Sequence, residues 1–77
     1  MAQRKIYCFD LTNRLNQACE QSGLSNEQIG KRAGLSRKQI YAYRNGVNTP
    51  NAFYMAKICL VLGVSADWIL LGKGEMK

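Results

Sequence analysis

Apolar residues recur along the chain at the spacing of an α-helix, in five segments separated by residues that end helices. In the fourth segment Met55, Ile58, Cys59 and Leu62 occupy positions i, i+3, i+4 and i+7, which form one face of a helix. The pattern predicts five helices, at roughly residues 10–21, 26–33, 37–45, 52–62 and 66–71, and a solvated tail at 73–77. We therefore expect an all-α fold in which residues 1–77 form a single domain.

Two of the predicted helices begin with the same four-residue pattern. Ser25 is followed three residues later by Gln28, and Ser36 is followed by Gln39. Such a pair forms a capping box, in which each side chain bonds to a backbone N–H of the other residue. Gly34 lies between the two helices, where a glycine can take the left-handed conformation that ends a helix. The sequence thus predicts two short helices joined by a tight turn.

The chain is basic, and its cations are concentrated around these two helices. It has 11 Lys and Arg residues against 5 Asp and Glu residues, which gives a net charge of +6. Residues 25–50 hold five cations and one acid, Glu27. A basic balance favours a polyanionic partner, which is either nucleic acid or an anionic membrane surface.

The predicted helix at 37–45 carries its charge on the side away from the core. With Ile40 and Tyr43 facing inward, the opposite side and flanks of the helix hold Arg37, Lys38, Tyr41, Ala42 and Asn45. Cations at a helix start oppose the helix dipole, so their presence there favours an anionic partner over simple solvation. Arg and Lys can donate to guanine or to phosphate, and a small Ala can touch a thymine methyl. The second helix of a DNA-binding helix-turn-helix enters the major groove in this way.

The segment "LSNEQIGKRAGLSRKQIYAYRNG", followed by a loop with a proline and by "LGVSADWILLG", resembles the lambda-type phage repressor and Cro family over roughly residues 10–72. The most specific features are Gly34 in the turn, Ile40, Asn45-Gly46 and the pattern "GVS.DW..LG". The resemblance implies a five-helix, lambda-repressor-like domain that binds a pseudo-palindromic operator, usually as a two-fold dimer.

The resemblance and the positions of the cations on the predicted helices together give a set of expected DNA contacts. The expected base-contacting residues are Arg37, Lys38, Tyr41 and Ala42. The expected backbone-contacting residues are Asn26, Lys31, Arg32, Arg44, Asn45, Gly46, Asn48 and Asn51. Structural alternatives stay open, namely solvation for the cations, surface packing for Tyr41 and ordinary helix-end roles for Asn26 and Asn45.

The sequence departs from the family pattern at two linked positions. Many relatives pair an arginine late in the first helix with a glutamate near the end of the third, and here those positions hold Cys19 and Arg44. Glu20 is then a candidate partner for Arg44, whose role stays open between an ion pair and a phosphate contact. Arg37 and Lys38 also replace the usual base-contacting glutamines, so the resemblance implies no particular operator sequence.

Leu70 and Leu71 are adjacent on the last predicted helix and cannot both face one core. At least one of them is therefore expected at the surface, where it would suit a small two-fold interface. The family commonly dimerises through this helix, so we expect a homodimer, at least on DNA. A single tolerated surface leucine is the alternative.

The sequence favours binding over catalysis. There is no histidine, no glycine loop that would hold a phosphate, and the acids are scattered, so no enzyme activity is expected. Cys8, Cys19 and Cys59 match no zinc spacing, and their odd number argues against a disulfide framework. We expect reduced thiols in or near the core, no metal and no cofactor. No signal peptide or membrane-spanning run is visible, so a cytoplasmic location is expected.

These features predict a sequence-specific transcriptional regulator that binds double-stranded DNA, as a phage or prophage repressor or a Cro-like protein does. An antitoxin or a restriction–modification controller shares the fold and stays open. A protein-interaction module that no longer contacts DNA also stays open. A non-specific membrane or RNA binder would explain the charge but not the helix-turn-helix.

Overall fold

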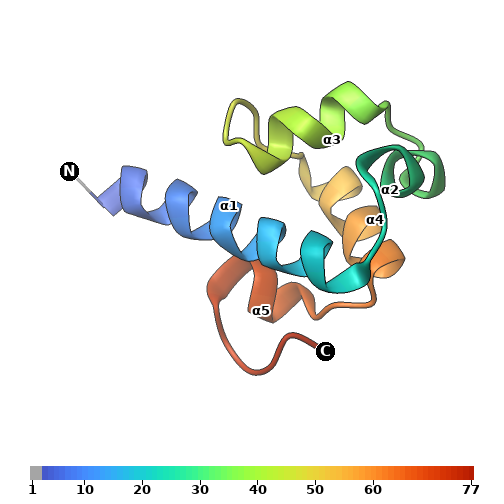
Figure 1. Cartoon of the computed structure of the whole chain (residues 1–77). Coiled ribbons are helices and arrows are strands. Elements are labelled where there is room, and N and C mark those ends of the chain that lie inside the picture. Colours follow the sequence, from blue (N-terminus) through green and yellow to red (C-terminus); the bar gives the residue numbers. More distant parts are fainter. Residues whose placement is uncertain (1–2) are drawn as a thin grey trace.

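The computed structural model describes the backbone of residues 3–77 and the side chains from residue 10 onward. This part of the chain contains five α-helices and no strand: α1 (Gln3–Ser22), α2 (Asn26–Ala33), α3 (Arg37–Arg44), α4 (Ala52–Leu62) and α5 (Ala66–Leu71). The all-α fold predicted from the sequence is confirmed. Figure 1 shows α1 crossing the molecule, with α2, α3 and α4 on one side of it and α5 on the other.

The first helix is longer than the sequence pattern predicted, because it begins at Gln3 instead of near Asp10. Residues 3–9 contain neither glycine nor proline, so no residue there interrupts the helix. A helix that has already formed extends by one hydrogen bond per added residue, which explains the earlier start. The third helix ends one residue earlier than predicted, because Asn45 has left the helical conformation and serves as the C-cap.

The core combines the inward faces of all five helices. Its buried side chains are Leu11, Leu15, Ala18, Cys19, Ile29, Ala33, Leu35, Ile40, Tyr43, Met55, Ile58, Cys59, Leu62 and Ile69. No polar or charged side chain is buried in the described part of the chain. Burial of apolar surface therefore holds α2 and α3 against α1 and α4.

Both predicted capping boxes are present. The hydroxyl oxygens of Ser25 and Ser36 accept hydrogen bonds from the backbone N–H groups of Gln28 and Gln39, each at 3.1 Å. In return, the N–H of each serine donates to the glutamine Oε1 at 2.9 Å. An N-cap of this kind contributes about 1 kcal/mol to helix stability, so the starts of both short helices are well defined.

The turn between α2 and α3 brings the two backbones very close together. Gly34 takes a φ of 77°, and its N–H donates to the Gly30 carbonyl oxygen. The N–H of Leu35 donates to the same oxygen at 2.8 Å. A Cβ on Gly30 would lie 2.5 Å from the Leu35 carbonyl oxygen, so no side chain fits at this position. Gly30 was not predicted to have a role, although a glycine inside a short helix indicates close packing.

Hydrogen bonds hold α5 at both of its ends. Arg14 of α1 donates through Nε to the Ile69 carbonyl oxygen at 2.9 Å and through Nη2 to that of Leu70 at 3.1 Å. The C-terminal tail, which was expected to be solvated, turns back toward the start of α5 (Figure 1). There the Met76 carbonyl oxygen accepts a hydrogen bond from the Ser65 N–H at 2.7 Å. The tail is therefore partly ordered by a backbone hydrogen bond that the local sequence does not predict.

Replacing Gly30 with alanine should lower the free energy of unfolding by about 1–3 kcal/mol, because the new methyl group would force α2 and α3 apart. The sign is diagnostic, since Gly→Ala inside an unhindered helix stabilises by about 1 kcal/mol. Urea denaturation of Gly30→Ala against wild type measures the change. Lys31→Ala, at the exposed neighbouring position, is the control and should change stability very little. A Gly30→Ala protein that is more stable than wild type would contradict the close approach.

Candidate nucleic-acid interface

The outer surface of α3 presents the four residues that the sequence predicted would contact bases. Arg37 and Lys38 lie exposed in the first turn, and the Tyr41 side chain is 61% exposed one turn later. Ala42 is half-buried and small, so its side chain projects less from the helix than its neighbours do. The outer surface of α3 therefore presents two cations, a phenol group and a small apolar residue.

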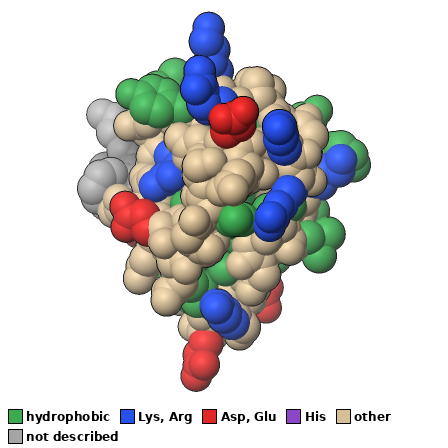
Figure 2. Space-filling view, turned by 45° about the vertical axis from the view of Figure 1, so that its right-hand side comes forward, with side chains coloured by type: hydrophobic (Ala, Val, Ile, Leu, Met, Phe, Trp, Pro, Cys, Tyr) green, Lys and Arg blue, Asp and Glu red, His purple; other side chains and the backbone are tan. Residues whose placement is uncertain are grey.

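Further cations surround this surface. Lys31 and Arg32 are exposed in the last turn of α2. Figure 2 shows Lys and Arg side chains standing out separately over one face of the molecule. Within the described side chains, neither these two cations nor Arg37 or Lys38 forms an ion pair, so their charges are available to an external anion.

The remaining asparagine and glycine residues predicted to contact the DNA backbone lie at the start of α2 and beyond the end of α3. They are Asn26 at the start of α2, and Asn45, Gly46, Asn48 and Asn51 at the end of α3 and in the following loop. Two of these amides also have structural roles. Asn45 donates through Nδ2 to the Tyr41 carbonyl oxygen at 2.8 Å, and the Asn51 Oδ1 accepts from the Tyr54 N–H at 2.9 Å. Each Nδ2 still has an N–H that could donate outward.

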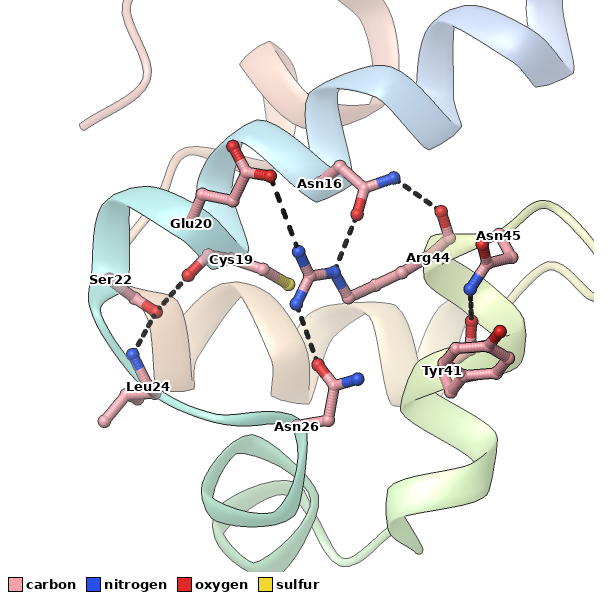
Figure 3. A network of polar contacts seen from close by, with 9 residues as sticks. All are labelled: Asn16, Cys19, Glu20, Ser22, Leu24, Asn26, Tyr41, Arg44 and Asn45. Atoms are coloured by element: carbon pink, nitrogen blue, oxygen red, sulfur yellow. Dashed lines mark hydrogen bonds and ion pairs between the residues drawn. The ribbon is translucent and has the colours of Figure 1, made fainter.

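The guanidinium group of Arg44 is directed into the protein (Figure 3). Its Nε donates to Asn16 Oδ1 at 2.7 Å, and its Nη1 donates to Asn26 Oδ1 at 2.8 Å. Its Nη2 lies 3.9 Å from Glu20 Oε2, so the pairing that the sequence suggested is present at long range. The Arg44 side chain is only 20% exposed. These contacts favour a structural role for Arg44 over the phosphate contact predicted for it.

Asn16 was not predicted from the sequence, although it forms two hydrogen bonds with Arg44. Its Nδ2 donates to the Arg44 carbonyl oxygen while its Oδ1 accepts from the side chain. Asn16 and Glu20 are four residues apart and share a face of α1. The signal was therefore available, because a partner for Arg44 at position 20 implies that position 16 is also within reach.

Residues 12–75 match the family model of a helix-turn-helix domain. The chain belongs to the helix-turn-helix domain family. The structure places α2 and α3 as the two helices of that motif, with the glycine turn between them. The lambda-type, repressor-like resemblance found in the sequence is thereby confirmed.

Three curated relatives are named as transcriptional regulators for conjugative elements. They are the HTH-type transcriptional regulators for conjugative element R391 of Providencia rettgeri, for SXT of Vibrio cholerae and for pMERPH of Shewanella putrefaciens. Each is 29% identical to this helix-turn-helix domain over 66 residues, which is 86% of the chain. The chain matches only 30% of the length of each relative. No solved structure matches the chain.

The described cysteines of this helix-turn-helix domain, Cys19 and Cys59, are buried and unbridged. Burial raises the pKa of the Cys19 thiol, the Arg44 guanidinium lowers it by a smaller amount, and Glu20 raises it further. Burial also raises the pKa of Cys59. The side chain of Cys8 lies outside the described residues. Within the described chain no helix could cross a membrane, and no group of three metal-ligating side chains is found.

The two leucines at the end of α5 differ in exposure. Leu71 is 59% exposed, whereas Leu70 is half-buried and packs against the core. Leu70 also lines an apolar hollow of about 310 Å³, together with Leu11, Pro50 and Met55. The expectation that at least one of these leucines would lie at the surface is confirmed. Whether Leu71 meets a second copy of the chain stays a prediction.

Proposed function

We propose that residues 1–77 form a sequence-specific DNA-binding domain of a transcriptional regulator of the phage-repressor or Cro type. The observation that carries this proposal is the outer surface of α3, where Arg37 and Lys38 are exposed and unpaired beside the small Ala42. The names of the relatives support a role in transcription, because each is a transcriptional regulator for a conjugative element. The presence of a helix-turn-helix supports DNA as the partner.

In this proposal α3 lies in the major groove, where an α-helix fits and where each base pair presents a distinct pattern of donors and acceptors. Arg37 and Lys38 donate to guanine, Ala42 contacts a thymine methyl, and Tyr41 contacts an adjacent base. Asn26 on one side and the residues from Asn45 to Asn51 on the other bind phosphates, which fixes the orientation of the helix. Two copies bind half-sites about 34–36 Å apart and occupy a pseudo-palindromic operator.

Selection from a random duplex DNA library at near-physiological salt tests the proposal. We expect enrichment of a two-fold motif whose half-sites are one helical turn apart. Binding without any enriched motif would contradict sequence-specific recognition, because the positive charge alone gives non-specific affinity. Failure to retain any DNA would favour a protein-interaction module.

Lys38→Ala should weaken binding to the selected operator by about 1–3 kcal/mol and relax the preference at one base pair. Asn45→Ala should weaken binding to operator and random duplexes by similar factors, because a phosphate contact is independent of sequence. Fluorescence anisotropy with both duplexes measures the two effects. Equal losses on both duplexes for Lys38→Ala would contradict its assignment as a base-contacting residue.

Leu71→Asp should weaken binding to the full two-fold operator and leave binding to an isolated half-site unchanged, because a charge there would disrupt the proposed contact between two copies. Leu60→Asp is a matched control, since Leu60 is 82% exposed on α4, outside the proposed interface. Titrations with full-site and half-site duplexes measure the difference. If Leu71→Asp binds the full site as wild type does, the dimer contact lies elsewhere.

A further inference from the structure

The side-chain amide of Asn26 is held in one orientation by Arg44. A guanidinium group has only hydrogen-bond donors, so it can bond to the oxygen of an amide but not to its nitrogen. The 2.8 Å contact from Arg44 Nη1 to Asn26 Oδ1 therefore fixes which end of the amide faces inward. Figure 3 shows Asn26 Nδ2 pointing away from Arg44.

The Asn26 Nδ2 group has no partner among the described residues. Asn26 is the first residue of α2 and is half-buried. No side-chain nitrogen or oxygen of the described residues is both buried and without a hydrogen-bond partner, so the unpaired Nδ2 is accessible from outside. A DNA phosphate oxygen only accepts hydrogen bonds, so it would be attracted by Nδ2 and repelled by Oδ1. The orientation that Arg44 enforces is thus the one that suits a phosphate.

Arg44 is itself well restrained, which makes it suited to this task. Asn16 accepts from its Nε at 2.7 Å and also donates to its backbone carbonyl oxygen. The ion pair with Glu20 adds little restraint, because its atoms are 3.9 Å apart and the Glu20 side chain is 77% exposed. The amide contacts therefore connect the end of α3 with α1 and with the start of α2.

We propose that Arg44 is a positioning residue that holds Asn26 with Nδ2 outward to donate to a DNA phosphate, and that Arg44 does not bind the phosphate itself. This inference rests on the proposed function, because it needs DNA as the partner. It replaces the direct phosphate contact expected for Arg44 from the sequence. It also makes the placement of this donor depend on the end of α3, so that the phosphate contact and the groove contacts keep a fixed relation.

A double-mutant cycle with Arg44→Met and Asn26→Ala tests the proposal. Arg44→Met keeps a long, unbranched side chain but has no hydrogen-bond donor, so it cannot bond to the oxygen of either asparagine. We expect each single variant to weaken DNA binding about fivefold to tenfold, with no further loss in the double variant. The dependence of affinity on salt should stay unchanged, because no cation that binds phosphate has been removed. Affinities are measured on a random duplex as well as on the operator.

Two results would overturn the proposal. One is a weaker dependence of DNA affinity on salt in Arg44→Met, which would show that the Arg44 guanidinium itself neutralises a phosphate. The other is a double variant whose loss is the product of the single losses, which indicates independent contacts. Ile58→Val is the control for lowered stability, because it removes a buried methyl group in α4 and should leave DNA affinity unchanged.

A spectroscopic readout separates this inference from the proposed function. In the protein without DNA, the Nδ2 proton resonances of Asn26 should shift in Arg44→Met and remain unchanged in Ile58→Val. If wild type binds random duplexes but selects no operator, sequence-specific recognition fails while the cycle still tests the phosphate contact. If wild type binds no DNA at all, both proposals are overturned.

Discussion

The backbone of Leu35 and Ser36, which leads into α3, lies against Gly30 of α2 at a separation that leaves no room for a side chain on that glycine. Two backbone N–H groups, those of Gly34 and Leu35, donate to the single Gly30 carbonyl oxygen, so the turn cannot open without losing both bonds. Burial of Ile29 and Ile40 adds apolar contact to the same junction. The angle at which α3 leaves the turn follows from this junction, and the exposure of its outer residues follows from that angle.

The other end of α3 is held by hydrogen bonds. Arg44 bonds to Asn16 of α1 and to Asn26 of α2, so the last residue of α3 is connected to both neighbouring helices. One end of α3 is thus fixed by close packing and the other by directed hydrogen bonds. A helix fixed in this way can present Arg37 and Lys38 in a constant position, which is what contact with base edges in a groove requires.

Local rules accounted for much of this structure. The spacing of apolar residues predicted the five helices, and the repeated Ser-to-Gln pattern predicted both capping boxes, because each depends on neighbours within one helical turn. The same rules did not predict the return of the tail, because the bond from Ser65 to Met76 depends on how the tail folds back in space. The role of Asn16 was missed for a related reason, since its partner Arg44 is 28 residues away in the sequence.

The candidate site also has features that local rules predict and features that depend on distant partners. A helical wheel is enough to place Lys38 and Ala42 on the outer side of α3, because the buried side is fixed by Ile40 and Tyr43. The wheel gives no information about which atoms of a half-buried asparagine point outward. That orientation is set by a partner on another helix, as Asn26 demonstrates.

The most direct test of the account is a map of backbone amide chemical shifts as the protein is titrated with duplex DNA. We predict that the largest changes fall at the start of α2, along α3 and in the loop that follows it. The amides around Leu60, an exposed apolar residue of α4, should change little. Changes centred on Leu60, with α3 unaffected, would contradict the claim that the outer surface of α3 contacts DNA.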